Sequence, residues 1–458
     1  MENNTQLKEM IRSMVIDVLQ GQKQEVASSQ PFKQAPRGQV EPGVFDTVDE
    51  AIQAAKAAQA RFEDCTLATR EKVIADIRAA MRPRVQELAQ KTVEETGMGR
   101  VADKVLKLNL TLDKTPGVED LVTECETGDN GMTLYELSAY GVIGAITPST
   151  NPAETLICNT IGMLAAGNAV FFSVHPGAKH LSRLLVSELN QIIAKSIGIE
   201  NLIVTLREPS IESAQEMMLH PDVSLLVVTG GPGVVKQALQ SGKKVIGAGA
   251  GNPPAFVDET ADIKKAAQDI VLGASLDNNI LCIAEKSVVA MRQIEPQLVQ
   301  EMVKVGCVLV ENQQDIQRLV DLTVLPNGTP NKKFVGKNAS VILDAAHIPY
   351  NGDPRLIIMR TPKDHPFAVI EMLMPILPVV TVDSFDEGLD VCLMLEAGLH
   401  HTATMHSLNM ERLNRMARKM KTSIFVKNGP SYAGLGFSGE GTTTFTIATP
   451  TGESTTSA

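Results

Sequence analysis

Apolar runs of strand length recur along most of the chain, and helical patterns separate many of them by roughly 20–30 residues. Strands that alternate with helices in this way are typical of βαβ units, which build a parallel, doubly wound sheet. The runs fall into two series, at residues 141–146, 169–174, 202–205 and 224–229, and at residues 287–290, 308–310, 356–359, 377–382, 402–405 and 423–426. The sequence therefore predicts two doubly wound α/β lobes, with ligands at the carboxyl ends of the strands and in a cleft between the lobes.

The residues ahead of the first series predict two helices and one hairpin. Helical periodicity covers residues 48–62 and residues 69–96. Residues 123–139 read as extended chain on both sides of the turn Gly128-Asp129-Asn130-Gly131, which is typical of a β-hairpin.

The charge balance of this 458-residue chain limits its classes of partner. It carries 42 basic and 53 acidic residues, a net charge of −11, which argues against nucleic acid or an anionic membrane as the main partner. Hydrophobic residues make up 43% and charged residues 21%, as in ordinary globular proteins. The longest apolar stretch, residues 155–172, is interrupted by asparagines and glycines, so we expect a buried helix with a turn there and no membrane span.

Six cysteines are scattered along the chain without a C-x-x-C pair or a Cys/His cluster. This spacing argues against a disulfide framework and against a structural zinc site. The first residues lack the basic start and the small-residue cleavage site of a secretory signal. We therefore expect a cytosolic protein whose anionic ligands bind in local pockets of backbone N–H groups.

The first twenty residues form a separate amphipathic pattern. Their apolar residues follow the spacing of one helical face: Leu7, Met10, Ile11, Met14, Val15, Val18 and Leu19. Residues 21–43 are rich in Gln, Pro and Ser and predict a flexible linker. The helix either folds back on the body or docks in a groove of another protein. Binding to a membrane surface is the weakest alternative, because its few charges are balanced.

Three glycine-dense loops are candidate ligand sites. They are Thr229-Gly230-Gly231-Pro232-Gly233, which opens a predicted helix, Gly247 to Pro254, which closes a predicted strand, and Gly434 to Gly439. None has the spacing of a P-loop or of a Rossmann G-x-G-x-x-G fingerprint. Each is either a tight turn or a phosphate cradle, and the first is the best cradle candidate because it precedes a helix N-terminus.

Cys282 and Asn151 are the candidate catalytic residues. Cys282 follows the polar segment Asp277-Asn278-Asn279 just ahead of a strand, where a thiol is accessible, whereas Cys158, Cys307 and Cys392 are expected to be inert core residues. A structural role for Cys282 stays open from its local sequence. Asn151 lies between two prolines at a strand end, which suits either an oxyanion-binding amide or an N-cap.

The pair His400-His401 lies at the start of a predicted strand. Adjacent strand residues point to opposite faces, so at most one of these rings faces a given site. We interpret neither as a metal ligand.

Together these segments resemble the aldehyde dehydrogenase superfamily, in particular its CoA-acylating branch in the bacterial microcompartments of propanediol and ethanolamine utilisation. The resemblance runs over nearly the whole chain. Its most specific segments are residues 247–254 and Cys282-Ile283-Ala284-Glu285-Lys286, and further matches lie at residues 95–99, 115–120, 149–152, 229–233, 398–403 and 427–434.

The resemblance implies that an aldehyde, NAD+ and coenzyme A are converted to acyl-CoA and NADH, with propionaldehyde the leading substrate. Cys282 would attack the aldehyde, and Asn151 with the Cys282 N–H would hold the oxyanion. NAD or CoA would contact a set of residues in the carboxyl-end loops of the first lobe together with one glutamate that holds the nicotinamide ribose. This set is Thr147, Pro148, Ser149, His175, Pro176, Gly177, Thr229, Gly230, Gly231, Gly233, Val234, Gly247, Ala248, Gly249 and Glu371.

One absence is informative within this resemblance. Hydrolytic relatives carry a general-base glutamate in a Glu-Leu-Gly-Gly motif, where this chain has Ala248-Gly249-Ala250-Gly251. Without a base to activate water, an acyl-enzyme waits for a better nucleophile, such as the thiol of coenzyme A. Small residues there would also leave room for the pantetheine arm.

The resemblance also assigns the remaining segments. Residues 1–20 would be an encapsulation helix that binds microcompartment shell or cargo proteins through residues 5–20, and residues 21–43 a linker. Residues 44–122 and 141–250 would form the NAD-binding domain, residues 251–430 the catalytic domain, and residues 123–140 and 431–458 an oligomerisation arm of a homodimer or homotetramer. Leu281 stands where the family usually has proline, and His175-Pro176 where hydrolytic relatives have Lys-Pro.

Three alternatives stay open at this stage. The main substrate is propionaldehyde, acetaldehyde or another short aldehyde. The same residues serve the reverse reaction, reduction of acyl-CoA to aldehyde. A catalytically inactive lumen protein of the microcompartment would lack a reactive Cys282 and would not bind NAD.

Overall fold

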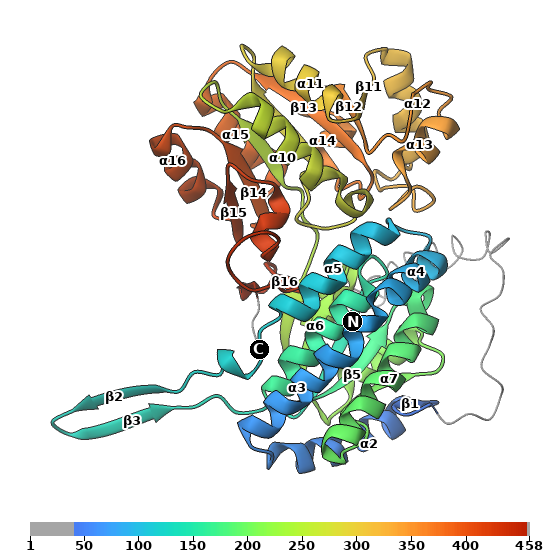
Figure 1. Ribbon diagram of the computed structural model, residues 1–458, viewed down its shortest axis with the longest axis vertical. Coiled ribbons are helices and arrows are strands. Elements are labelled where there is room, and N and C mark those ends of the chain that lie inside the picture. Colours follow the sequence, from blue (N-terminus) through green and yellow to red (C-terminus); the bar gives the residue numbers. More distant parts are fainter. Residues whose placement is uncertain (1–40, 456–458) are drawn as a thin grey trace, which may run out of the picture. The chain divides into compact units, whose positions relative to one another are not determined.

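The computed structural model describes residues 41–455 of the chain, which form one compact unit with two parallel sheets. The encapsulation helix and most of the linker predicted from the sequence lie outside the described residues. The two sheets and their helices appear in Figure 1, and they confirm the predicted doubly wound α/β fold.

The first sheet has six parallel strands in the order β1-β6-β5-β4-β7-β8. They are β1 (Val44–Phe45), β4 (Val142–Thr147), β5 (Ala169–Val174), β6 (Ile203–Leu206), β7 (Val223–Thr229) and β8 (Lys244–Ala248). Its helices are α2 (Val48–Glu63), α3 (Leu67–Met81), α4 (Val85–Thr96), α5 (Val101–Lys114), α6 (Pro152–Ala165), α7 (Lys179–Ile197), α8 (Ile211–Leu219) and α9 (Pro232–Leu239). The strands are almost wholly buried, as their uninterrupted apolar runs require.

The second sheet has seven parallel strands in the order β11-β12-β13-β10-β9-β14-β15. They are β9 (Pro254–Val257), β10 (Ser287–Met291), β11 (Cys307–Leu309), β12 (Leu356–Arg360), β13 (Ile376–Val382), β14 (Thr402–His406) and β15 (Ile424–Lys427). Its helices are α10 (Ile263–Ser275), α11 (Glu295–Lys304), α12 (Gln313–Thr323), α13 (Ala339–Ala345), α14 (Pro366–Val369), α15 (Phe385–Glu396) and α16 (Met410–Met420). Each sheet has its own large apolar core cluster.

Two local expectations need correction, and several elements were not predicted. The single helix predicted at residues 69–96 is two helices, because a 3-10 turn at Arg82–Arg84 contains Pro83, which has no N–H to donate. The helix α5 and the strands β1, β9, β16 and β17 were not predicted. The apolar stretch at residues 155–172 is most of α6, a turn and the start of β5, so the expected buried helix with a turn leads into a strand.

The hairpin predicted at residues 123–139 is present as β2 (Glu124–Gly128) and β3 (Gly131–Tyr135), paired antiparallel. Every residue of both strands is exposed, and the hairpin projects from the neighbouring elements in Figure 1. Its assignment as an oligomerisation arm stays a prediction.

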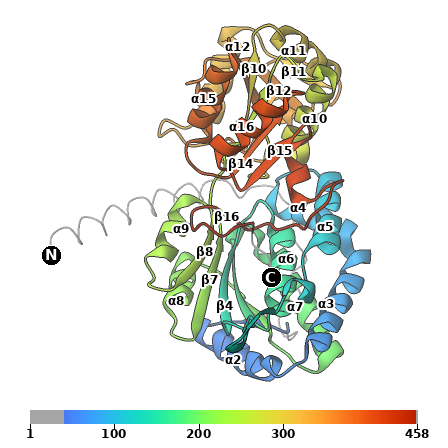
Figure 2. The same cartoon turned by 90° about the vertical axis from the view of Figure 1, so that its left-hand side faces the viewer.

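The segment after β15 contacts both sheets. It begins with a 3-10 turn at Ser431–Leu435 beside Glu285 and ends in a small hairpin, β16 (Ile447–Ala448) with β17 (Ser454–Thr455). β16 lies beside β8 (Figure 2), where the Gly247 N–H donates to Thr451 Oγ1 at 2.9 Å. Residues 446–451 thus contact the ends of β7 and β8, at the edge of the first sheet that carries the candidate ligand loops.

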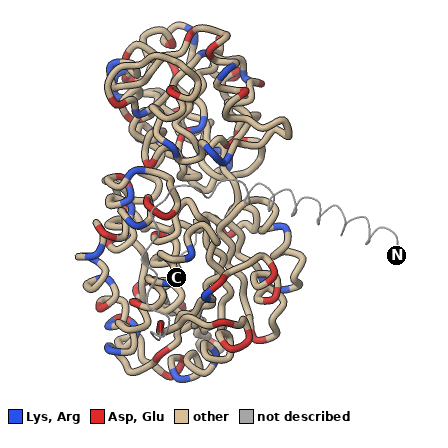
Figure 3. Tube along the Cα trace, turned by 90° about the vertical axis from the view of Figure 1, so that its right-hand side faces the viewer, with Lys and Arg blue, Asp and Glu red and all other residues tan. Residues whose placement is uncertain are grey.

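Charge is mixed along the described part of the chain. Lys and Arg alternate with Asp and Glu in Figure 3. Within residues 41–455, no helix combines the length and the apolar character that crossing a bilayer requires.

Candidate active site

Cys282 lies in a loop between α10 and β10, as predicted, and its side chain is partly exposed. Three consecutive residues of this loop have left-handed backbone: Asp277 (φ 50°), Asn278 (φ 55°) and Asn279 (φ 66°). Asp and Asn adopt this conformation more readily than other residues with side chains, which explains the polar segment ahead of the cysteine. Asn279 Nδ2 donates to the carbonyl oxygens of Ala274 (2.7 Å) and Glu285 (3.0 Å), which closes the loop.

A buried ammonium group lies under this loop. Lys286 Nζ donates to the carbonyl oxygen of Asn279 (2.7 Å), to Asn279 Oδ1 (2.6 Å) and to the carbonyl oxygen of Leu281 (3.0 Å). Burial lowers the pKa of Lys286 to about 8, against the opposing effect of nearby acidic groups. Burial, with a smaller effect of Glu371, raises the pKa of the Cys282 thiol to about 12, and Lys286 opposes this shift. The thiol is therefore protonated in the unliganded protein, so reaction requires a base or an added positive charge.

The walls around Cys282 are apolar. Cys282 packs against a cluster that gathers residues from α5, α6, the cysteine loop, the start of β15 and the segment after β15: Leu110, Cys158, Leu276, Leu281, Ile283, Ala284, Ile424, Leu435, Phe445 and Ile447. Tyr432 and Phe437 are partly buried members of the same cluster. A reacting carbonyl beside the thiol would have a hydrocarbon environment for a short alkyl chain.

Asn151 lies in the turn between β4 and α6, where the sequence predicted it. It occupies the N-cap position of α6, but its side chain makes no capping hydrogen bond, so the N-cap interpretation does not explain this residue. Its Oδ1 accepts a 2.5 Å hydrogen bond from Lys107 Nζ, and its Nδ2 donates to Thr150 Oγ1 at 3.3 Å. The amide is buried and fixed, as an oxyanion donor must be.

The loops predicted to bind the cofactor lie together at one edge of the first sheet. β5, β4, β7 and β8 are adjacent in that sheet, and each predicted segment follows the carboxyl end of one of them. Residues 147–149 follow β4 and His175, Pro176 and Gly177 follow β5. Thr229, Gly230, Gly231, Gly233 and Val234 lie where β7 leads into α9, and Gly247, Ala248 and Gly249 lie at the end of β8.

Two features of this edge fit a dinucleotide. A Cβ added at Gly231 or Gly233 would meet no other atom within 4 Å, so the start of α9 is open to a phosphate group. Thr147 Oγ1 is buried without a hydrogen-bond partner among residues 41–455, so it is available to a ligand. The residues present therefore suit a bound NAD.

The segment at residues 248–252 connects the cofactor edge to the cysteine. A Cβ on Gly251 would lie 2.7 Å from the carbonyl oxygen of Cys282 and 2.8 Å from Cγ of His401, so only glycine fits. The Gly251 N–H donates to Glu371 Oε1 at 3.1 Å. Burial raises the pKa of Glu371, and Lys286 opposes the shift. Glu371 is thus brought beside Cys282 although 89 positions separate them in the sequence.

His401 is a site residue that the sequence prediction missed. Its side chain is buried, whereas His400 is exposed with left-handed backbone (φ 54°), so only one of the pair faces the site. Its Nδ1 lies 2.9 Å from Thr402 Oγ1, and Nε2 is buried without a partner in the described structure. Burial, with Lys286, lowers the pKa of His401 to about 4, so the ring is neutral near pH 7. The sequence signal that could have identified His401 is its place in residues 398–403, one of the segments that resemble the family.

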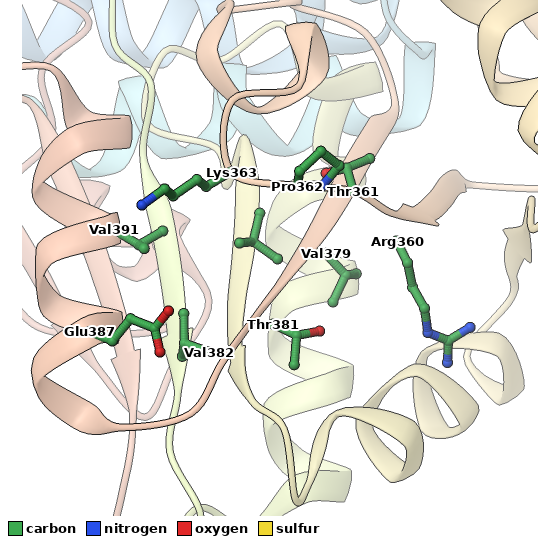
Figure 4. Close-up of a pocket in the computed structure, with 10 residues that line it drawn as sticks. Arg360, Thr361, Pro362, Lys363, Val379, Thr381, Val382, Glu387 and Val391 are labelled. Atoms are coloured by element: carbon green, nitrogen blue, oxygen red, sulfur yellow. The ribbon is translucent and has the colours of Figure 1, made fainter.

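The second lobe does not present its carboxyl strand ends to the site, contrary to the expectation from the sequence. Cys282, Glu371 and His401 precede β10, β13 and β14, so the site uses the amino ends of the second sheet and the carboxyl ends of the first. A hollow of about 370 Å³ lies at the opposite, carboxyl edge of the second sheet (Figure 4). It is lined by Arg360, Lys363 and Glu387 and contains none of the predicted site residues.

Comparison with known proteins gives consistent matches. The model of the aldehyde dehydrogenase family matches residues 18–446. The propanal dehydrogenase (CoA-propanoylating) of Citrobacter freundii is 50% identical over 457 residues, which cover 100% of this chain and 96% of that protein.

Two solved structures are similar over most of the chain. A Rhodopseudomonas palustris propionaldehyde dehydrogenase with bound CoA and an acylated cysteine has a TM-score of 0.90 and 49% identity, covering 91% of this chain and 96% of that one. A propionaldehyde dehydrogenase from the fucose utilisation microcompartment of Clostridium phytofermentans has a TM-score of 0.90 and 47% identity, with the same shares covered.

Proposed function

Because the chain belongs to the aldehyde dehydrogenase family, we propose that it is a CoA-acylating enzyme that converts a short aldehyde, NAD+ and coenzyme A to acyl-CoA, NADH and a proton. The observation that carries the acylating reaction is the segment Ala248-Gly249-Ala250-Gly251 beside Cys282, which has no carboxylate to activate water. The 50% identity to a CoA-propanoylating enzyme over the whole chain supports the same conclusion.

In the first half-reaction, Cys282 is the nucleophile. Its thiol gives up the proton that appears in the overall reaction, and the sulfur bonds to the aldehyde carbon. The carbonyl oxygen becomes an oxyanion that accepts hydrogen bonds from Asn151 Nδ2 and the Cys282 N–H. NAD+ bound at the carboxyl edge of the first sheet supplies the acceptor for the hydride that leaves this carbon. The C=O bond then re-forms, and a thioester on Cys282 results.

In the second half-reaction, the thiol of coenzyme A replaces Cys282. The CoA sulfur, once deprotonated, attacks the thioester carbon, and the bond from that carbon to Cys282 breaks. We propose that the CoA thiol donates a hydrogen bond to His401 Nε2, which is neutral and has no partner in the described structure, and that its proton passes to the departing Cys282 sulfur. Asn151 holds the second oxyanion as it holds the first.

The substrate is a short aliphatic aldehyde. The cluster around Cys282 offers hydrocarbon walls for a short alkyl chain. Propionaldehyde is the leading substrate on the identity to the propanal enzyme, and acetaldehyde is the next.

We further propose a microcompartment setting and an oligomeric state. One similar structure comes from an enzyme of a bacterial microcompartment. Residues 5–20 would bind shell or cargo proteins, and the exposed hairpin β2–β3 would pair with another copy of the chain in a dimer or tetramer.

The test follows NADH absorbance with propionaldehyde and NAD+, with and without coenzyme A. With CoA we expect continuous turnover; without it, a burst of about one NADH per Cys282 that then stops, because the acyl-enzyme accumulates. Cys282→Ala abolishes both signals, and Cys65→Ala, a change between α2 and α3, leaves them intact. Continuous turnover without CoA would contradict the acylating mechanism, and an inert wild type would favour a structural lumen protein.

A further inference from the structure

Lys107 on α5 is fully buried, and its ammonium group has three polar neighbours. Nζ lies 2.5 Å from Asn151 Oδ1, 2.6 Å from Asp277 Oδ2 and 2.9 Å from Glu154 Oε1. Burial alone would lower the pKa of Lys107, but the carboxylates of Asp277 and Glu154 outweigh this effect and raise it. The side chain is therefore charged throughout the working pH range.

The charge of Lys107 decides which way the Asn151 amide faces. An ammonium group donates hydrogen bonds and accepts none, so only the oxygen of the carboxamide lies stably against it. With Oδ1 held by Lys107, Nδ2 is on the other side of the amide plane. One of its two hydrogens reaches Thr150 Oγ1, and the second is left for a ligand.

The same ammonium connects Asn151 with the loop of the proposed nucleophile. Asp277, its second neighbour, begins the left-handed segment that leads to Cys282. The Asp277 N–H donates to Asp103 Oδ2 at 2.9 Å, so the backbone of Asp277 is fixed as well as its side chain. Lys107 thus joins the turn after β4 to the loop before β10 through two contacts of one atom.

We propose that Lys107 is a positioning residue for the reaction, which holds Asn151 with Nδ2 toward the oxyanion and in register with the Cys282 loop. The inference rests on the proposed acyl-transfer function. Without the ammonium, the amide is free to flip, and a flipped Asn151 presents an oxygen to the developing negative charge. Loss of one oxyanion donor typically costs about 10²–10³ in rate.

The matched pair for the test is Lys107→Met and Lys104→Met. Lys104 is equally buried on the same helix and also pairs with Asp277 (3.0 Å), but it donates to the Thr150 carbonyl oxygen at 3.3 Å and not to Asn151. We expect Lys107→Met to lower kcat about 100-fold or more with little change in the KM for aldehyde. Lys104→Met should lower kcat less than about tenfold.

The rate at which iodoacetamide alkylates Cys282 separates a positioning role of Lys107 from a general structural role. Only a structural role would lower this rate. Displacement of iodide creates no oxyanion, so the alkylation rate should stay within about threefold of wild type in Lys107→Met. A fall in alkylation as large as the fall in kcat would overturn the proposal, because it would mean that the cysteine loop itself had collapsed.

A double-mutant cycle with Asn151→Ala completes the test. If Lys107 acts through Asn151, Lys107→Met has no further effect on kcat once Asn151 is alanine. If the double variant instead lowered kcat by the product of the two single effects, the inference would be overturned. If Lys107→Met folds poorly, Lys107→Met with Glu154→Gln restores the charge balance of the cluster and should show the same defect. An inactive wild type would instead overturn the proposed function.

Discussion

The ammonium group of Lys286 lies 3.0 Å from the carbonyl oxygen of Leu281, the residue immediately before Cys282. One buried cation thus fixes the backbone of the proposed nucleophile loop and places a positive charge near its thiol. Loss of the Lys286 ammonium should therefore change the reactivity of Cys282.

Lys286→Met should slow alkylation of Cys282 by iodoacetamide at pH 7.5 by about tenfold. The reason is that the lost charge lets the thiol pKa rise further, and the thiolate is the reactive form. The pH profile of alkylation is the measurement. An unchanged profile would show that Lys286 serves only the fold of the loop.

Gly231→Ala should raise the KM for NAD+ several-fold while leaving the melting temperature unchanged. The added methyl group meets no protein atom within 4 Å, and the backbone there has ordinary dihedral angles, so the fold tolerates it. It would, however, occupy the space through which a phosphate approaches the start of α9. Steady-state kinetics measure the KM, and thermal unfolding measures the melting temperature. An unchanged KM would mean that NAD+ does not bind at this loop.

Stability should fall as the pH is lowered from about 6.5 toward 4, in part because of His406. Burial, with Lys265 nearby, lowers its pKa to about 4, so the unfolded chain binds a proton in this range before the folded protein does. The full shift corresponds to on the order of 3 kcal/mol. Urea unfolding at several pH values measures the free energy of unfolding, which should fall less steeply with decreasing pH in His406→Gln than in wild type. Equal pH slopes in the two proteins would refute the assignment.

The hairpin β2–β3 should be required for oligomerisation. Met132 and Leu134 are exposed by 65% and 53% and lie on one face of β3, and an isolated two-stranded hairpin is unstable in water. Met132→Glu combined with Leu134→Glu should reduce the mass measured by light scattering after size exclusion. Leu408→Glu, exposed by 74% elsewhere, is the control. A mass unchanged in the double variant would place the subunit interface on another surface.

The sequence was most informative where burial leaves a continuous apolar run. The run at residues 169–174 coincides with β5, and the other predicted strands agree within one or two residues, because parallel strands are covered on both faces. β9 was missed since it begins with Pro254, directly after a glycine-rich segment, and proline is uncommon inside strands. Asn151 was found because two prolines mark its turn.

Other site residues depend on distant contacts that local sequence does not contain. Lys104 and Lys107 resemble the solvent-facing lysines of any helix, and their burial follows only from pairing with Asp277 and Glu154 across the fold. His401 is buried against Gly251 and follows His400, whose left-handed backbone no periodicity predicts.

The contacts of residues 446–451 with β8 have a consequence for biosynthesis. β8 is the outermost strand of its sheet, and the hydroxyl of Thr451 satisfies one of its backbone N–H groups. A ribosome makes that strand about two hundred residues before the segment that covers it. Until then the nascent chain presents an open strand edge, which is the kind of surface through which chains aggregate. We therefore expect the first half of the chain to be most prone to aggregation while the second half is being made.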